Sequence, residues 1–249
     1  MKNKEDQLNI AAVIDGDFIP FYVCHNKKGD EPKTLDDCLY ICDDFINNIN
    51  KAVKSDVYLG FLTKGKCFRY NINPSYKGNR KYDNIPNFSN EIREHLINTH
   101  GFTYQEGYEA DDLVLSFKKQ NKEYNSIIVS PDKDILLLEG KHFNPREMKF
   151  VETDEVTAAY KFWSDMIIGQ PGDNIKGIPG KGKSFAEKLL FNIEDEESLR
   201  TLVFDEYINY FEEYEGIKEF TKNYLSLKLV DNVSINQFKL NNVDKIVCE

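Results

Sequence analysis

The sequence predicts an α/β protein with a mostly parallel central sheet flanked by helices, followed by a helical C-terminal portion. Two observations lead to this prediction. Short apolar runs that resemble buried strands alternate with amphipathic helical stretches, an order typical of parallel sheets. After about residue 152 the strand patterns stop and helical patterns continue. We therefore expect an α/β core over residues 1–152 and a helical portion over residues 153–249.

Three stretches within the first 134 residues have the pattern of buried strands. They are NIAAVIDGD (residues 9–17), DVYLGFL (56–62) and NSIIVSPDKD (125–134). Each is a short apolar run, and acidic residues end the first and the last. The segment KCFRYNI (66–72) is a candidate for a further strand.

Amphipathic helices are expected between and after these strands. The stretch 34–53 has apolar residues at helical spacing, and Thr34 is a suitable N-cap. Residues 85–100, 109–120, 154–169 and 184–191 also have helical patterns, and the remaining tail is expected to form further helices. The helix over 109–120 begins with acids, which the helix dipole favours.

The composition is that of a soluble globular protein. The chain has 249 residues, of which 41% are hydrophobic and 30% charged. No apolar run approaches the roughly 18 to 20 residues that span a bilayer, and the N-terminal MKNKEDQLN lacks the apolar core of a signal peptide. We therefore expect a cytoplasmic location. The five cysteines form no disulfide framework, and we expect Cys38 and Cys42 to be buried, reduced thiols.

Carboxylates from separate segments are expected to meet at one edge of the sheet. Sites in parallel sheets form beyond the carboxyl ends of the strands. Like charges a few Å apart repel unless cations lie between them, and oxygen ligands without His or Cys favour Mg²⁺ or Mn²⁺. Seven residues form this candidate metal site: Asp15, Glu109, Asp111, Asp112, Asp132, Asp134 and Asp173.

Each acidic segment taken alone has an ordinary structural explanation. Asp15-Gly16 fits a turn, the acids of EADD fit the first turn of a helix, and those of SPDKD fit a helix cap. The metal-site hypothesis depends on their convergence. It also changes how the net charge is understood, because the formal value of −10 falls to −3 once seven carboxylates are set aside. The remaining surface can then carry a basic face.

The segment GIPGKGKS (177–184) matches the nucleotide-binding pattern G-x-x-x-x-G-K-[ST]. That loop requires a buried strand before it and a helix after it. The chain before Gly177 instead has the pattern of a helix followed by GQPGDN, and no convincing strand ending in Asp follows Ser184. We therefore do not expect ATP binding.

Five motifs in order resemble the 5′-nuclease family, which includes bacteriophage 5′-3′ exonucleases and flap endonucleases and the 5′-nuclease domain of bacterial DNA polymerase I. The resemblance covers about residues 10–191. The motifs are VIDGD, FRYNINPSYKGNR, YEADD, SPDKD and GQPGDNIKGIPGKGKSFAEKLL. The resemblance implies a PIN-like nuclease core with a short helical arch at about 74–108 and a helix–three-turn–helix element at about 160–191.

The resemblance implies a role for each matching residue. Asp15, Glu109, Asp111 and Asp112 would surround one metal ion, Asp132 would lie near both ions, and Asp134 and Asp173 would lie toward the second. Lys77 and Arg80 would add catalytic positive charge. Substrate contacts would come from Tyr76, Lys77 and Arg80 and, at the Gly-rich hairpin, from Gly177, Gly180, Lys181, Gly182, Lys183 and Ser184.

The implied function is metal-dependent 5′-3′ exonuclease or structure-specific 5′-flap endonuclease activity in replication or repair. Two Mg²⁺ ions, replaceable by Mn²⁺, would be the cofactors, with K⁺ at the hairpin. The implied partners are DNA with 5′ ends or flaps and RNA–DNA hybrids. We expect a monomer in the cytoplasm of a bacterium or of a phage's host, with neither a membrane nor ATP as a partner.

Two departures from the family pattern keep alternatives open. The family has an acid near the end of the second strand, yet none lies between Asp56 and Asp83, and Gln170 stands where an acid is usual. The chain could therefore be a catalytically weakened DNA-structure-binding protein of the same fold. A third alternative is an RNA-cleaving domain of the related PIN type.

Overall fold

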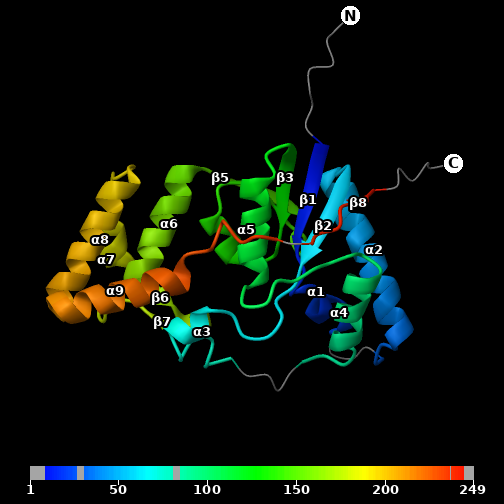
Figure 1. The fold of residues 1–249 in the computed structure, drawn as a ribbon, viewed down its shortest axis with the longest axis horizontal. Helices are drawn as coiled ribbons and strands as arrows, with labels where there is room; N and C mark the ends of the chain where they lie inside the picture. Colours follow the sequence, from blue (N-terminus) through cyan, green and yellow to red (C-terminus); the bar gives the residue numbers. More distant parts are fainter. Residues whose placement is uncertain (1–8, 27–30, 81–84, 236, 244–249) are drawn as a thin grey trace, which may run out of the picture.

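The computed structural model describes residues 9–26, 31–80, 85–235 and 237–243. At its centre is a six-stranded sheet in the order β5-β4-β3-β1-β2-β8 (Figure 1). The four inner strands are parallel, and the edge strands β5 and β8 are antiparallel to their neighbours. The predicted mostly parallel sheet is confirmed. The strands are β1 (Asn9–Asp15), β2 (Val57–Phe61), β3 (Tyr124–Val129), β4 (Gly140–Asn144), β5 (Lys149–Thr153) and β8 (Asn241–Asn242).

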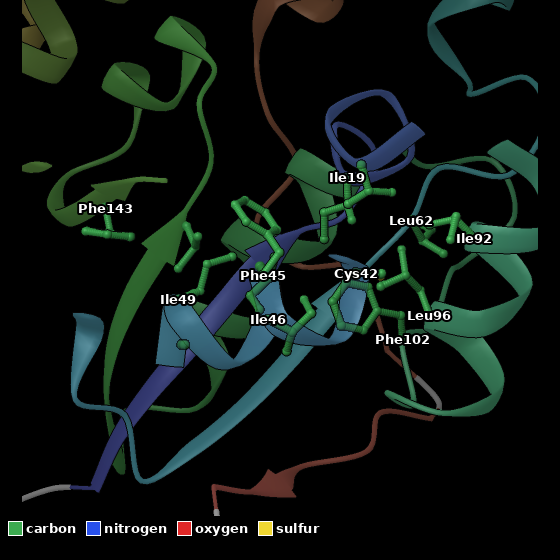
Figure 2. Close-up of a cluster of buried hydrophobic side chains, with 14 of the residues drawn as sticks. Ile19, Cys42, Phe45, Ile46, Ile49, Leu62, Ile92, Leu96, Phe102 and Phe143 are labelled. Carbon is green, nitrogen blue, oxygen red and sulfur yellow. The ribbon is translucent and has the colours of Figure 1, made fainter. Parts of the chain in front are cut away.

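Helices cover both faces of this sheet, because the side chains of β1 alternate between two apolar layers. Ala12 and Ile14 belong to the layer that holds α1, α2 and α4, and Figure 2 shows side chains of that layer packed together. Ala11 and Val13 belong to the opposite layer, which holds α5. The helices are α1 (Ile19–Cys24), α2 (Leu35–Val53), α4 (Ser89–Asn98) and α5 (Ala110–Gln120).

The start of α2 follows from its sequence. Thr34 is the N-cap, as predicted: its side chain accepts a hydrogen bond from the Asp37 amide, and the Asp37 carboxylate accepts one from the Thr34 amide. This reciprocal pair satisfies two amides that the helix leaves without partners. Cys38 and Cys42 lie on the buried face of α2, as predicted. Burial raises the pKa of Cys42 to about 12, so its thiol stays protonated.

The helical portion lies beside the sheet, on the left of Figure 1. It has its own apolar core, in which Trp163, Tyr207 and Phe220 pack together. Between α6 and α7 the chain forms a hairpin of two short strands, β6 and β7, joined by the turn η2. The elements are α6 (Glu155–Ile168), β6 (Gly169–Gln170), η2 (Pro171–Asp173), β7 (Ile175–Lys176), α7 (Lys183–Leu189), α8 (Glu196–Phe211) and α9 (Glu213–Leu227).

The tail after α9 differs from the prediction, which was wrong to continue the helices. The chain returns to the α/β core, where Val233 is buried in the layer around α5. Strand β8 then pairs with β2 and closes that edge of the sheet. The two predicted portions are therefore joined by the C-terminal residues as well as at α6.

The segment 66–72 forms helix α3 (Arg69–Ile72), so the predicted strand is also wrong. Two contacts explain the difference. The edge of β2 is already occupied by β8, and the Asn73 amide donates to the Arg69 carbonyl, which closes a helical turn. The helix predicted at 85–100 is observed as α4, and residues 81–84 of the predicted arch lie outside the described residues. Within the described ranges, no helix has the length and apolar character needed to cross a membrane.

Candidate active site

Two neighbouring strands bring carboxylates to one edge of the sheet. Ile14 of β1 pairs with Val129 of β3, so the residues that follow both strands lie side by side. The Ser130 hydroxyl donates to Oδ2 of Asp15 at 3.0 Å and accepts from the Asp132 amide at 3.2 Å. The buried Ser130 therefore holds Asp15 and Asp132 at the same edge.

Asp15, Asp111 and Asp132 form a group that we call the acidic cluster. Burial raises the pKa of Asp15 to about 7, and the charges of Asp17 and Asp132 add to the rise. Burial also raises the pKa of Asp111 well above its ordinary value, with further contributions from Asp15, Glu109 and Asp132. Within the described part of the chain, no Lys or Arg forms an ion pair with these three carboxylates. The cluster therefore carries repulsion that a bound cation would relieve.

Glu109 and Asp173, in contrast, are paired with cations. Lys77 forms an ion pair with Glu109 and lies 3.9 Å from Asp173, while Arg80 lies 2.6 Å from Asp173. Burial opposes the positive charge of Lys77, but the two carboxylates outweigh it and raise the pKa of Lys77. Lys77 also has a left-handed backbone (φ 52°), a conformation that costs of order 1 kcal/mol in a residue other than Gly.

Tyr76 does not occupy the substrate-facing position that the resemblance implies. Only 2% of this residue is exposed, and its ring packs edge-on against Tyr70. Its hydroxyl lies 2.8 Å from Glu109 and 3.1 Å from Asp173. In this structure the Tyr76 hydroxyl contacts both carboxylates from the buried side, and the ring offers almost no surface to a substrate.

Asp112 likewise differs from its predicted role. Its two carboxylate oxygens each lie 2.7 Å from the Arg69 guanidinium, and both side chains are almost completely buried. The same oxygens accept from the amides of Glu109 and Val230. These contacts use the carboxylate fully inside the fold, so Asp112 is a structural anchor. The sequence missed this because the helical phase of EADD does not say which acid faces inward.

Asp134 lies in a second group of polar residues. The Gln170 amide donates to Asp134 at 2.9 Å and to Asp165 at 3.1 Å, and Asp165 also pairs with Lys161. Burial raises the pKa of Asp134, while the hydrogen bond from Gln170 opposes the rise. Gln170 therefore supplies a neutral donor between two carboxylates. Asp165 was not predicted, although an acid on the apolar face of a helix is the signal that could have found it.

A small cavity of about 30 Å³ lies between Asp111 of the acidic cluster and the other carboxylates described above. A water molecule needs roughly 10 to 15 Å³ on this measure, so the cavity has room for about two. Carboxylates from three separate segments therefore share one polar space. The acidic residues that line it are Glu109, Asp111, Asp134 and Asp173.

Asp17 is a further carboxylate that the sequence analysis did not single out. It accepts from the Thr63 amide at 2.9 Å and forms an ion pair with Arg93 of α4 at 3.0 Å. Thr63 follows β2, where the family usually has an acid, and its hydroxyl accepts from the Ala110 amide. Asp17 thus brings a carboxylate to the end of β2 from the neighbouring strand, although this charge is already paired.

The Gly-rich hairpin has two kinds of glycine. A Cβ on Gly177 would lie 2.1 Å from the Ile167 carbonyl oxygen, and one on Gly169, which has φ of 83°, would lie 2.4 Å from the Gly177 nitrogen. These two glycines are required for close packing of the backbone. Gly180 and Gly182 have open space where a Cβ would stand, so they are the glycines that leave the surface flat.

The hairpin side chains predicted to contact DNA differ in how they are held. Lys181 lies over the Phe185 ring and 3.5 Å from Glu206. Lys183 is 83% exposed and Ser184 is exposed as well. An open groove of about 760 Å³ runs along the hairpin and reaches Asn79. The element before the glycines is the two-residue antiparallel strand β7, which differs from the buried parallel strand of a nucleotide-binding loop.

Comparison with known proteins identifies the chain's relatives. Residues 12–161, more than half of the chain, match the family described as 5′-3′ exonuclease, N-terminal resolvase-like domain. A 5′-3′ exonuclease of Mycoplasmopsis pulmonis is 28% identical over 211 residues, which are 75% of this chain and 68% of that protein. A DNA polymerase I of Borreliella burgdorferi is 34% identical over 147 residues, which are 52% of this chain but 16% of the polymerase.

A solved structure supports the fold. The flap endonuclease of bacteriophage T5, in a complex with DNA and metal ions, matches with a TM-score of 0.68 and 18% identity. The match covers 87% of this chain and 89% of the phage protein. At this identity the likeness establishes a shared architecture, including the helical C-terminal portion.

Proposed function

The chain belongs to the family of 5′-3′ exonucleases, and we propose that it hydrolyses phosphodiester bonds of DNA at 5′ ends or 5′ flaps. The observation that supports this most directly is the acidic cluster. Three carboxylates with no cationic partner among the described residues share one edge of the sheet, and two of them have raised pKa values. Buried carboxylates with raised pKa values cluster at functional sites.

The oxygen donors of this edge fit divalent metal ions. We propose that Asp15, Asp111 and Asp132 hold one Mg²⁺ or Mn²⁺, with Glu109 near it, and that Asp134 and Asp173 hold a second. These donors are hard oxygens without His or Cys, the set that Mg²⁺ and Mn²⁺ prefer. When bound, such ions lower the pKa of a water molecule and offset negative charge on a phosphate.

Lys77 and Arg80 supply fixed positive charge beside these carboxylates. Glu109 and then Asp173 raise the pKa of Lys77, and Asp173 raises the pKa of Arg80, so the two side chains remain charged at neutral pH. We propose that both orient the scissile phosphate and stabilise the charge that develops on it. The strained backbone of Lys77 is consistent with this role, because such strain occurs most often at functional sites.

The hairpin is the proposed contact with duplex DNA. The exposed Lys183 and the open surfaces at Gly180 and Gly182 suit approach to backbone phosphates, which positions a duplex without selecting a sequence. Lys181 and Ser184 lie next to them and are included in the proposed contact. Gly177 takes part through the packing that shapes the hairpin.

The finer assignments belong to the same proposal. The nuclease core would span residues 1–152 and the DNA-binding helical portion residues 153–249, with the last residues returning to the core. RNA–DNA hybrids would be further substrates, K⁺ would bind at the hairpin, and the protein would act as a cytoplasmic monomer in replication or repair. The catalytically weakened binding protein is the less favoured alternative.

One incubation tests the proposed activity. A 5′-labelled flap duplex is mixed with the protein and Mg²⁺, Mn²⁺ or EDTA, and the products are sized on a gel. Asp132→Ala should abolish cleavage while duplex affinity stays within several-fold, and Asp205→Ala, which changes an exposed acid of α8, is the matched control. Normal turnover by Asp132→Ala in Mn²⁺ would remove Asp132 from the metal site. Intact binding without cleavage by the wild type would favour the alternative.

A further inference from the structure

Two of the four histidines in the sequence converge on one carboxylate outside the candidate active site. Asp43 lies on α2, His95 lies in the last turn of α4, and His100 follows the end of that helix. Nε2 of His95 lies 2.6 Å from Oδ1 of Asp43, and Nε2 of His100 lies 2.8 Å from the same oxygen. Three potential ligand atoms from two helices and a turn therefore meet at one point.

The local backbone explains why the two rings meet. Gly101 has φ of 65°, a left-handed conformation that turns the chain after α4, and Phe102 then enters the core. The rings of His95 and His100 are nearly perpendicular, with centroids 5.4 Å apart. In this arrangement both Nε2 atoms point at Asp43.

We propose that Asp43, His95 and His100 form a zinc-binding site that joins α2 to the end of α4. The three ligand atoms lie within 4.8 Å of one another. Ligands at tetrahedral zinc, with bonds of 2.0 to 2.1 Å, are about 3.4 Å apart, so the two contacts to Asp43, at 2.6 and 2.8 Å, need to open by about 0.6 to 0.8 Å. Imidazole nitrogens with one carboxylate suit zinc better than Mg²⁺.

Both histidines have the outer partners that zinc ligands require. Nδ1 of His100 lies 3.0 Å from the Tyr58 hydroxyl, and Nδ1 of His95 lies 3.2 Å from the Thr99 hydroxyl. When zinc takes Nε2, the proton of each ring resides on Nδ1 and can be donated to the hydroxyl oxygen. Such contacts fix the orientation and tautomer of a ligating histidine.

Burial also suits a bound ion. The side chains of His100 and His95 are 9% and 17% exposed, whereas that of Asp43 is 46% exposed. The imidazoles are thus held in the fold, and the half-exposed carboxylate can be reached from solvent. Burial lowers the pKa of His100, and the hydrogen bond to Asp43 opposes this shift.

The test measures zinc binding by calorimetry in excess Mg²⁺, which competes with zinc for the proposed oxygen sites of the acidic edge. We expect one zinc ion per chain and a rise in Tm of about 5 to 10 °C at a zinc concentration near 100 times Kd. His95→Gln combined with His100→Gln should remove this binding, and Asp43→Asn should weaken it by at least about tenfold. The visible spectrum of bound Co²⁺ gives an independent report of tetrahedral nitrogen and oxygen ligands.

Two variants serve as matched controls. Asp44→Asn changes the next, exposed acid of α2, and His25→Gln removes an exposed histidine elsewhere. Both should bind zinc as the wild type does. The proposal is overturned if Asp43→Asn and the double histidine variant, shown to be folded by circular dichroism, keep wild-type zinc affinity. It is also overturned if the wild type binds no zinc, or if Asp132→Ala rather than Asp43→Asn removes the binding. Cleavage activity enters none of these outcomes.

Discussion

Asp15→Asn should stabilise the metal-free protein, and the gain should grow with pH. The pKa of Asp15 is raised from an ordinary 3.8 to about 7. Below about pH 4 the carboxyl is protonated in the folded and unfolded chain, so it costs nothing. Between about pH 4 and 7 only the unfolded chain releases the proton, and the wild type loses stability. At about 1.4 kcal/mol per pKa unit, the full loss above pH 7 is up to about 4 kcal/mol.

The difference between two pH values isolates this effect. From pH 5 to pH 8 the advantage of Asp15→Asn over the wild type should increase by up to about 2.5 kcal/mol, the part of the linkage that falls in this interval. The measurement is urea unfolding of both proteins in EDTA at each pH. His142, whose pKa burial lowers to about 4, affects both proteins equally and cancels in the comparison.

Metal provides the second arm of the experiment. At pH 8, Mg²⁺ should stabilise the wild type, because it relieves the repulsion in the acidic cluster, and should stabilise Asp15→Asn much less. Asp44→Asn is the control, since this exposed acid accepts a hydrogen bond only from Asn48 among the described contacts. An advantage of Asp15→Asn that is the same at pH 5 and pH 8 would refute the argument that burial and neighbouring charges raise the pKa of Asp15.

Three further variants test other parts of the structure. Lys183→Ala should make the slope of log binding constant against log salt concentration shallower by about one unit for duplex DNA, whereas Lys218→Ala on α9 should leave it unchanged. Equal slopes for Lys183→Ala and the wild type would exclude the hairpin from the DNA contact. Arg69→Met should lower the free energy of unfolding in urea by about 3 to 5 kcal/mol because it leaves buried Asp112 unpaired. Adding Asp112→Leu should restore much of this free energy, and no recovery would contradict the pairing of Arg69 with Asp112. Gln170→Asp should lower the Mg²⁺ concentration for half-maximal cleavage, and coincident titration curves would show that Gln170 does not face the ions.

The strand ends could be predicted from the sequence because their signal is local. An apolar run stopped by an acid identified both Asp15 and Asp132, and parallel pairing then required them to share an edge. Ser130, which links them, carries no such signal. Its role depends on β1 and β3 being neighbours, and that is a fact of topology.

The orientation of consecutive acids could not be predicted. Asp111 and Asp112 are adjacent on α5, about 100° apart around the helix axis. One joins the acidic cluster, and the other faces Arg69 in the interior. The choice depends on the position of α3, which the sequence pattern predicted as a strand. The sequence pattern alone therefore could not separate a carboxylate of the acidic cluster from one that faces the interior.

Ion pairs with carboxylates explain how a chain of net negative charge can keep the side chains of Lys77 and Arg80 charged and in place to contact a phosphate. Lys77 and Arg80 are each bound by a carboxylate, and Tyr76 fixes both carboxylates from the buried side. If the proposed roles of Lys77 and Arg80 hold, a DNA phosphate would compete with these carboxylates for side chains that are already charged and oriented. Binding would then require an exchange of ion-pair partners and little further ordering of side chains. Mutation of Tyr76 should therefore affect cleavage through the positions of Lys77 and Arg80, even though the tyrosine itself is buried.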